Sequence, residues 1–243
     1  MRRLLVALLA GGSVLAAQAA DELALIQRGE EMVMGKCFLC HGATGDSSSP
    51  LYPKLAGQNA AYLLKQLRNF KSGARESNDM RKVVADMGDD EMHAVAHYFS
   101  RQQPSPGKSA YGEMRAIGER LYTQGNPANG LQPCRECHGD KGAGSDVLPR
   151  IAGQHTLYIE TQLNLFEERK RTNDNAQMQD IAKRLSIDEA RAAGQAFSGD
   201  TGKQIRVDLI VFGHGEGSMP VGLGARNLKG WREGSASTRQ KNH

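Results

Sequence analysis

The sequence predicts an all-α protein of two tandem domains joined by a short linker, and helical periodicity and an internal repeat support this. Apolar residues recur at helical spacing, and no segment shows the sustained alternation of a β-strand. Two similar units follow one another at an offset near 97 residues. We expect domains at 21–104 and 105–198, each about ninety residues, a plausible size for a small domain. The Pro-Ser-Pro-Gly run at 104–107 cannot continue a helix and marks the linker.

The same order of elements is expected in each unit. It is a helix, a cysteine-containing segment, a loop, a second helix, a methionine-bearing loop and a last helix. The second helices are expected at about 60–70 and 156–166. Acidic residues at 89–91 would stabilise the positive end of the dipole of the first unit's last helix.

The two ends of the chain have their own patterns. Two arginines, an apolar run and a small-x-small pattern at 17–19 are typical of a secretory signal peptide. The run is shorter than the roughly 20 apolar residues of a spanning helix, and glycines interrupt it. We therefore expect cleavage of residues 1–20 and export to the periplasm, with no transmembrane span. Residues 199–243 form a glycine-rich tail of unknown role.

Charge within the two units is balanced. Lys and Arg number 10 against 11 Asp and Glu in residues 21–104, and 12 against 12 in 105–198. A concentrated basic face of the kind that binds nucleic acid is therefore not expected.

All four cysteines lie in two C-x-x-C-H motifs, made of Cys37, Cys40 and His41, and of Cys134, Cys137 and His138. At this spacing two thiols can bond to one haem while the imidazole reaches its iron, so the motifs predict two covalently bound haem c groups. Two alternatives stay open. One is a disulfide framework, although four cysteines in 243 residues are few for one. The other is zinc, which requires four convergent ligands.

Methionine is the usual sixth iron ligand in small electron-transfer cytochromes. The repeat selects Met80 and Met178, which follow their motif histidines by 39 and 40 residues. Met87 aligns with Leu185 and is better explained as a core residue. Met219 precedes a proline, as the ligand does in many single-haem cytochromes, but it has no counterpart in the repeat.

Other recurring residues surround these candidates. Pro53 and Pro149 follow the histidines by 12 and 11 residues, where a carbonyl could accept the second imidazole N–H. Residues shared by the two units could approach haem propionates or simply pack; they are Tyr62, Gln66, Tyr158 and Gln162. A further histidine pair, His93 and His97, lies four residues apart on one helix and is more typical of a solvated face than of a metal site.

Together these motifs resemble the cytochrome c4 family. Each C-x-x-C-H-G segment is followed by proline, Leu-Ala-Gly-Gln or Ile-Ala-Gly-Gln, Tyr, Gln-Leu, Phe and then methionine, over roughly residues 22–198. The resemblance implies two class I cytochrome c domains with haems packed near their interface. It also implies an electron carrier, not an enzyme, that works in a respiratory chain with redox protein partners. A terminal oxidase or a cytochrome bc1-type complex would be such a partner.

The resemblance also implies roles for single residues. Cys37 and Cys40 would attach the first haem, with His41 and Met80 as axial ligands. For the second haem, the corresponding residues are Cys134, Cys137, His138 and Met178.

The chain departs from the family near its C-terminus, and other functions stay open. Gly194 would weaken the last helix by roughly 1 kcal/mol relative to alanine, which predicts a less stable second domain. The alternative functions are a dihaem peroxidase-type enzyme, a dihaem electron-transfer subunit of a dehydrogenase, and a zinc-stapled binding module. Peripheral membrane association is also left open.

Overall fold

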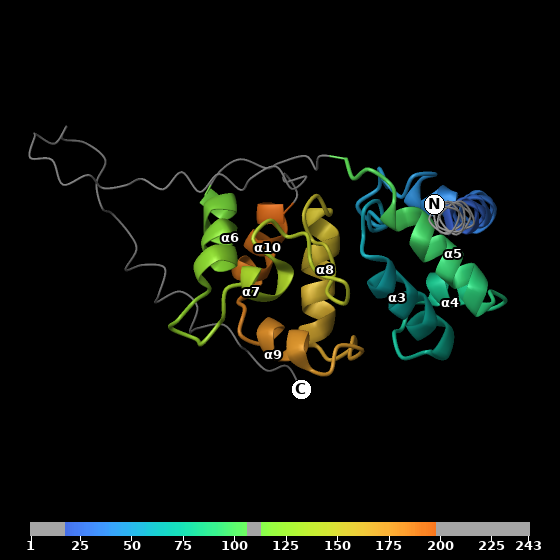
Figure 1. The fold of residues 1–243 in the computed structure, drawn as a ribbon. Helices are drawn as coiled ribbons and strands as arrows, with labels where there is room; N and C mark the ends of the chain where they lie inside the picture. Colours follow the sequence, from blue (N-terminus) through green and yellow to red (C-terminus); the bar gives the residue numbers. More distant parts are fainter. Residues whose placement is uncertain (1–17, 106–112, 198–243) are drawn as a thin grey trace, which may run out of the picture. The chain divides into compact units, whose positions relative to one another are not determined.

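The computed structural model describes residues 18–105 and 113–197, and this part of the chain is helical, as expected (Figure 1). Within it, β-structure is limited to two isolated bridges, Arg75 with Arg171 and Asn126 with Leu131. The expected tail lies outside the described residues, as do nearly all of the expected signal peptide and the second half of the expected linker. No helix in the described ranges combines the length and apolar character needed to cross a membrane.

The first half of the chain begins with a helix at 18–32 and continues through five named elements. They are η1 (Val33–Cys37), α2 (Phe38–His41), α3 (Ala60–Ser72), α4 (Asn78–Val84) and α5 (Asp89–Ser100). The second half repeats the order with α6 (Glu113–Gln124), α7 (Arg135–His138), α8 (Thr156–Glu167), α9 (Gln177–Ala182) and α10 (Ile187–Phe197). The expected second helices correspond to α3 and α8.

The segments expected to be methionine-bearing loops each contain a short helix instead, because local polar groups satisfy its first amides. The Ser77 hydroxyl accepts a hydrogen bond from Met80 N at 3.3 Å at the start of α4. A carboxylate oxygen of Asp174 accepts from Met178 N at the start of α9. Met80 therefore lies in the first turn of α4, which Ser77 caps, and Met178 lies in the first turn of α9, where Asp174 accepts from the first amides.

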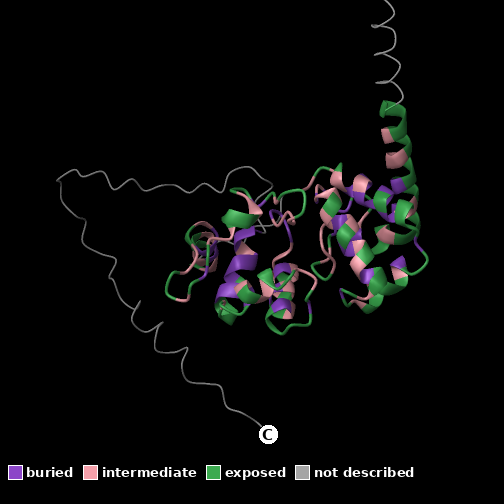
Figure 2. Cartoon of the chain, turned by 60° about the horizontal axis from the view of Figure 1, so that its bottom comes forward, coloured by how far each residue is buried: buried purple, intermediate pink, exposed green. Residues whose placement is uncertain are grey.

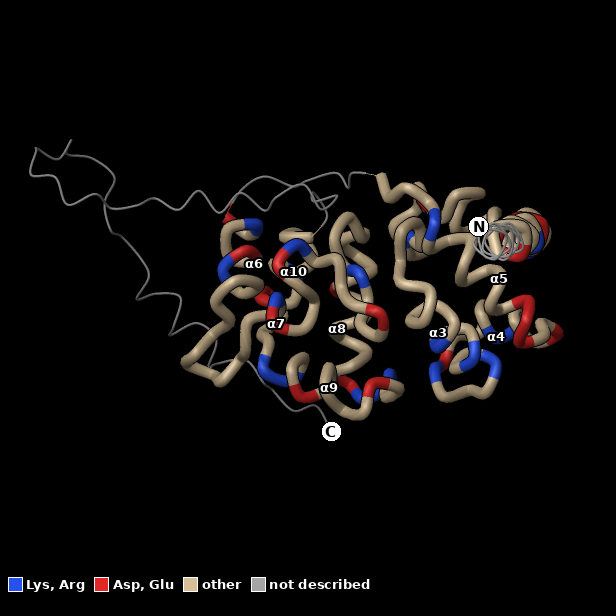
Figure 3. Tube along the Cα trace, in the orientation of Figure 1, with Lys and Arg blue, Asp and Glu red and all other residues tan. Residues whose placement is uncertain are grey.

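Each half has its own hydrophobic core, and buried faces of the helices line both (Figure 2). The first core includes Val33, Leu63, Val84 and Phe99, and the second includes Tyr122, Ile159, Leu163 and Phe197. The acidic residues at 89–91 form the first turn of α5, as expected, and acidic and basic residues are interspersed along both halves (Figure 3).

Glycine permits the closest helix contacts in both halves. A Cβ at Gly29 would clash with the carbonyl oxygen of Ala94 in α5, and one at Gly118 would clash with that of Ala192 in α10. Gly194 is also explained by packing: a Cβ there would lie 2.8 Å from the carbonyl oxygen of Thr156 at the start of α8. The glycine that weakens α10 intrinsically is therefore what lets α10 pack against α8.

The two halves contact each other through two matching glutamines. Gln58 Nε2 donates to the Arg150 carbonyl at 2.8 Å, and its Oε1 accepts from Arg150 N at 2.7 Å. In the same way, Gln154 Nε2 donates to the Lys54 carbonyl and its Oε1 accepts from Lys54 N, both at 2.9 Å. Each half thus holds a backbone segment of the other by two hydrogen bonds.

Candidate functional site

The first C-x-x-C-H motif lies at the junction of η1 and α2. Cys37 ends η1 and is partly buried, while Cys40 is exposed on α2. His41 ends α2 and is only 7% exposed. Gly42 then takes a positive φ of 77°, which turns the chain away from the helix.

A hydrogen bond to proline orients the imidazole of His41. Its Nδ1 lies 2.9 Å from the carbonyl oxygen of Pro53, so the ring donates from Nδ1 and keeps the lone pair of Nε2. Burial lowers the pKa of His41, and the bond to Pro53 only partly opposes this. The ring is therefore neutral near pH 7, the form that binds a metal.

The second motif repeats this arrangement. Cys134 precedes α7, and His138 ends it. His138 Nδ1 donates to the carbonyl oxygen of Pro149 at 3.1 Å, and burial lowers the pKa of this ring too. Both proline carbonyls thus lie where the repeat predicts them.

The thiols match haem attachment better than metal ligation. All four cysteines are free of disulfides. Burial raises the pKa of Cys37 and Cys134 to about 11, so both thiols are protonated at neutral pH in the chain without a bound metal. Among the described residues, no group of three or more His, Cys, Asp and Glu side chains is arranged to hold a metal ion.

The structure places each candidate methionine against the core that its motif also borders. Met80 and Cys37 both pack against the first core, and Met178 and Cys134 both pack against the second. Met87 is 1% exposed inside the first core, which agrees with a packing role. The Met219 candidate lies outside the described residues.

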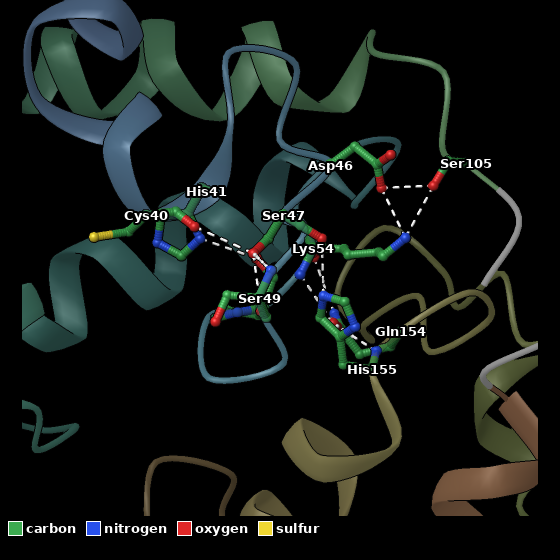
Figure 4. A network of polar contacts seen from close by, with 10 residues as sticks. Cys40, His41, Asp46, Ser47, Ser49, Lys54, Ser105, Gln154 and His155 are labelled. Atoms are coloured by element: carbon green, nitrogen blue, oxygen red, sulfur yellow. Dashed lines mark hydrogen bonds and ion pairs between the residues drawn. The ribbon is translucent and has the colours of Figure 1, made fainter. Parts of the chain in front are cut away.

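A polar network connects the first motif with the second half of the chain (Figure 4). Ser47 Oγ donates to the Cys40 carbonyl at 3.2 Å, and the Ser47 carbonyl lies 2.9 Å from His155 Nε2. Lys54 pairs with Asp46 at 2.8 Å, and Ser105 also donates to Asp46. Sequence analysis assigned no role to these residues, because nothing in the sequence shows that His155 of the second half contacts Ser47 of the first.

The histidine pair on α5 shows no third ligand within the described residues. The rings of His93 and His97 have centroids 6.5 Å apart, and the buried His97 Nδ1 finds no hydrogen-bond partner in 18–105 or 113–197.

In each half, a helical fold brings together a C-x-x-C-H motif, an imidazole held by a proline carbonyl and a methionine packed on the core. This combination defines a dihaem c-type cytochrome. Comparisons with known proteins agree with this class. The family model described as cytochrome c matches residues 26–103. Cytochrome c4 of Thiocapsa roseopersicina is 38% identical over 185 residues, which cover 74% of this chain and 95% of the relative. The chain belongs to the cytochrome c4 family.

Two further relatives extend the comparison. The crystal structure of reduced recombinant cytochrome c4 from Pseudomonas stutzeri superposes with a TM-score of 0.69 at 34% identity, over 72% of this chain and 97% of that one. A thiosulfate dehydrogenase electron acceptor of Stutzerimonas stutzeri is 36% identical over 189 residues, 75% of this chain and 87% of the relative. Family membership and the two motifs identify the protein as an electron carrier that binds two haem c groups, and not as an enzyme.

Proposed function

We propose that this chain is a periplasmic dihaem cytochrome that passes single electrons between redox proteins of a respiratory chain, with a terminal oxidase as acceptor. Residues 1–20 would serve as the export signal, 21–104 and 105–198 as the two cytochrome domains, and 199–243 as an added tail. The observation that carries the proposal is the matched pair of motif imidazoles, each bonded through Nδ1 to a proline carbonyl.

Each half would use the same set of residues. In the first, Cys37 and Cys40 hold the haem covalently, His41 supplies Nε2 to the iron, and Met80 supplies its thioether. The second half uses Cys134, Cys137, His138 and Met178. When bound, haem iron supplies a one-electron change between ferric and ferrous states. The carbonyls of Pro53 and Pro149 fix the imidazole rings and make them stronger donors.

An electron acceptor for thiosulfate dehydrogenase is a second candidate, favoured by the relative of that name. This role keeps the same site residues and changes only the donor. Mixing the oxidised protein with reduced thiosulfate dehydrogenase or with reduced bc1-type complex, and comparing the rates of haem reduction, would separate the two donors.

A redox titration of the exported protein tests electron transfer itself. We expect two one-electron steps, low-spin spectra in both states, and no uptake of carbon monoxide by the reduced protein. High-spin iron, carbon monoxide binding or turnover of peroxide would contradict the proposal and support a peroxidase-type enzyme.

A further inference from the structure

Two buried arginines lie where the halves of the chain meet. Arg75 follows α3 and Arg171 follows α8, and their backbones form an antiparallel bridge. Their exposed fractions are only 8% and 7%. The two arginines occupy equivalent positions in the repeat. The contact between the halves therefore contains one guanidinium from each half.

Each guanidinium reaches across to the other half. Arg75 donates to Gln66 of its own half at 2.8 Å, and to Tyr158 and Gln162 of the second half at 2.9 and 2.8 Å. It also lies 4.6 Å from the ring centroid of Phe70.

Arg171 mirrors these contacts. It donates to Gln162 of its own half at 2.7 Å, and to Tyr62 of the first half at 3.0 Å. Further contacts are to Asn173 at 3.2 Å, to Gln66 at 3.4 Å and to the ring of Phe166 at 4.4 Å. The hydrogen-bond partners of both guanidiniums are neutral amides and phenols.

Among the residues that the structure describes, no carboxylate balances the charge of this pair. Within 18–105 and 113–197, no Asp or Glu lies within 4 Å of either guanidinium. Both arginines donate to the same Gln162 oxygen, so two like charges are buried side by side. Burying an unpaired charge is unfavourable, so this pair favours a nearby anion.

The pKa of Tyr62 shows the electrostatic effect of the two arginines on a neighbouring group. Burial alone would raise its pKa, but Arg171 and Arg75 outweigh burial and lower it. The arginine cluster, which consists of Arg75 and Arg171, therefore stabilises negative charge although its surroundings are buried.

The chemistry and surroundings of the cluster favour carboxylates that belong to the holoprotein. Guanidinium forks match carboxylates in geometry. Lys54 and Arg150, whose backbones bind the glutamines of the opposite half, directly follow the prolines that hold the imidazoles. Both imidazole-holding loops thus belong to the same contact as the arginines, and each haem brings two propionate carboxylates.

We propose that Arg75 and Arg171 form one carboxylate site shared by the two halves. This site binds haem propionates, and its positive charge acts on the reduction potentials of both haems. This inference rests on the dihaem function proposed above. Positive charge near ferric iron disfavours the oxidised state, so the pair raises both potentials.

The test compares Arg75→Gln and Arg171→Gln holoproteins with Arg68→Gln. Arg68 is the matched control, because it is half exposed and pairs with Asp89 away from the cluster. We expect either cluster substitution to lower both reduction potentials in a spectroelectrochemical titration and to shift the propionate bands in resonance Raman spectra. Arg75→Lys should keep the potentials near those of the wild type while shifting the bands. Potentials that match those of Arg68→Gln would overturn the proposal.

A second experiment uses the wild-type protein and asks whether the bound carboxylate is a haem propionate or a free anion. It keeps the proposal testable if the variants fail to fold. At constant ionic strength, exchange of chloride for acetate should leave both potentials unchanged, and the Raman bands should be those of hydrogen-bonded propionates. Saturable shifts with the added anion, or bands of free propionates, would overturn the proposal. Haem content is measured on every sample. Two haems per chain with unchanged potentials would overturn only the carboxylate site, whereas missing haem would overturn the dihaem function.

Discussion

At the scale of single residues, burial and one hydrogen bond set the protonation state and the ring orientation of each motif histidine. Burial lowers the pKa of His41 and His138, and donation from Nδ1 to a proline carbonyl leaves the lone pair on Nε2. These bonds could be predicted, since the prolines recur at nearly the same distance from both histidines. The orientation of the rings could not, because it depends on how the loop folds back.

The methionine ligands are tested by Met80→Ala and Met178→Ala. Each should open one iron to external ligands, so the reduced variant should bind about one carbon monoxide per chain. Met87→Leu is the control, because it replaces a core methionine at nearly constant volume and should cost less than about 1.5 kcal/mol. A Met80→Ala protein with the wild-type spectrum and no carbon monoxide binding would rule out Met80 as a ligand.

At the scale of elements, periodicity predicted the long helices but not the two short ones that carry the methionines. Helices α4 and α9 form because Ser77 and Asp174 accept hydrogen bonds from their first turns. Helices as short as these have too few turns to give a periodic signal. The close packing at Gly194 could not be predicted from the sequence either. There, this glycine indicated only a weakened helix.

The helix crossings are tested by Gly118→Ala. A methyl group there would clash with the Ala192 carbonyl, so we expect a loss of about 1–3 kcal/mol in the free energy of unfolding, measured by urea denaturation. Gly35→Ala is the control, because a Cβ at Gly35 meets nothing within 4 Å. Equal stability of the two variants would contradict the packing described here.

At the scale of the whole molecule, duplication supplies the contact between the halves as well as the two sites. Equivalent residues face each other at this contact, as Gln58 and Gln154 do. The repeat could have identified the glutamines and arginines as pairs, because each recurs at an offset of 96. Their role could not be predicted, because nothing in the sequence shows which surfaces of the two units meet.

The contact is tested by Gln58→Ala and Gln154→Ala. Each leaves a backbone N–H and a carbonyl of the other half without their partner, which costs about 1–3 kcal/mol per buried group. Calorimetry should show a lower unfolding temperature for each variant and a broader or split transition for the double variant. The exposed Gln132→Ala should behave as the wild type. Unchanged unfolding of the double variant would mean that these bonds do not hold the halves together.

The central claim is that one chain covalently carries two haem c groups. Intact-mass spectrometry of the denatured exported protein tests it most directly, because covalent haem survives denaturation. The account predicts the mass of the processed chain plus two haems, falling to one haem after replacement of Cys134 and Cys137 by alanine. A mass with no haem, or with a single haem in the unaltered protein, would contradict it.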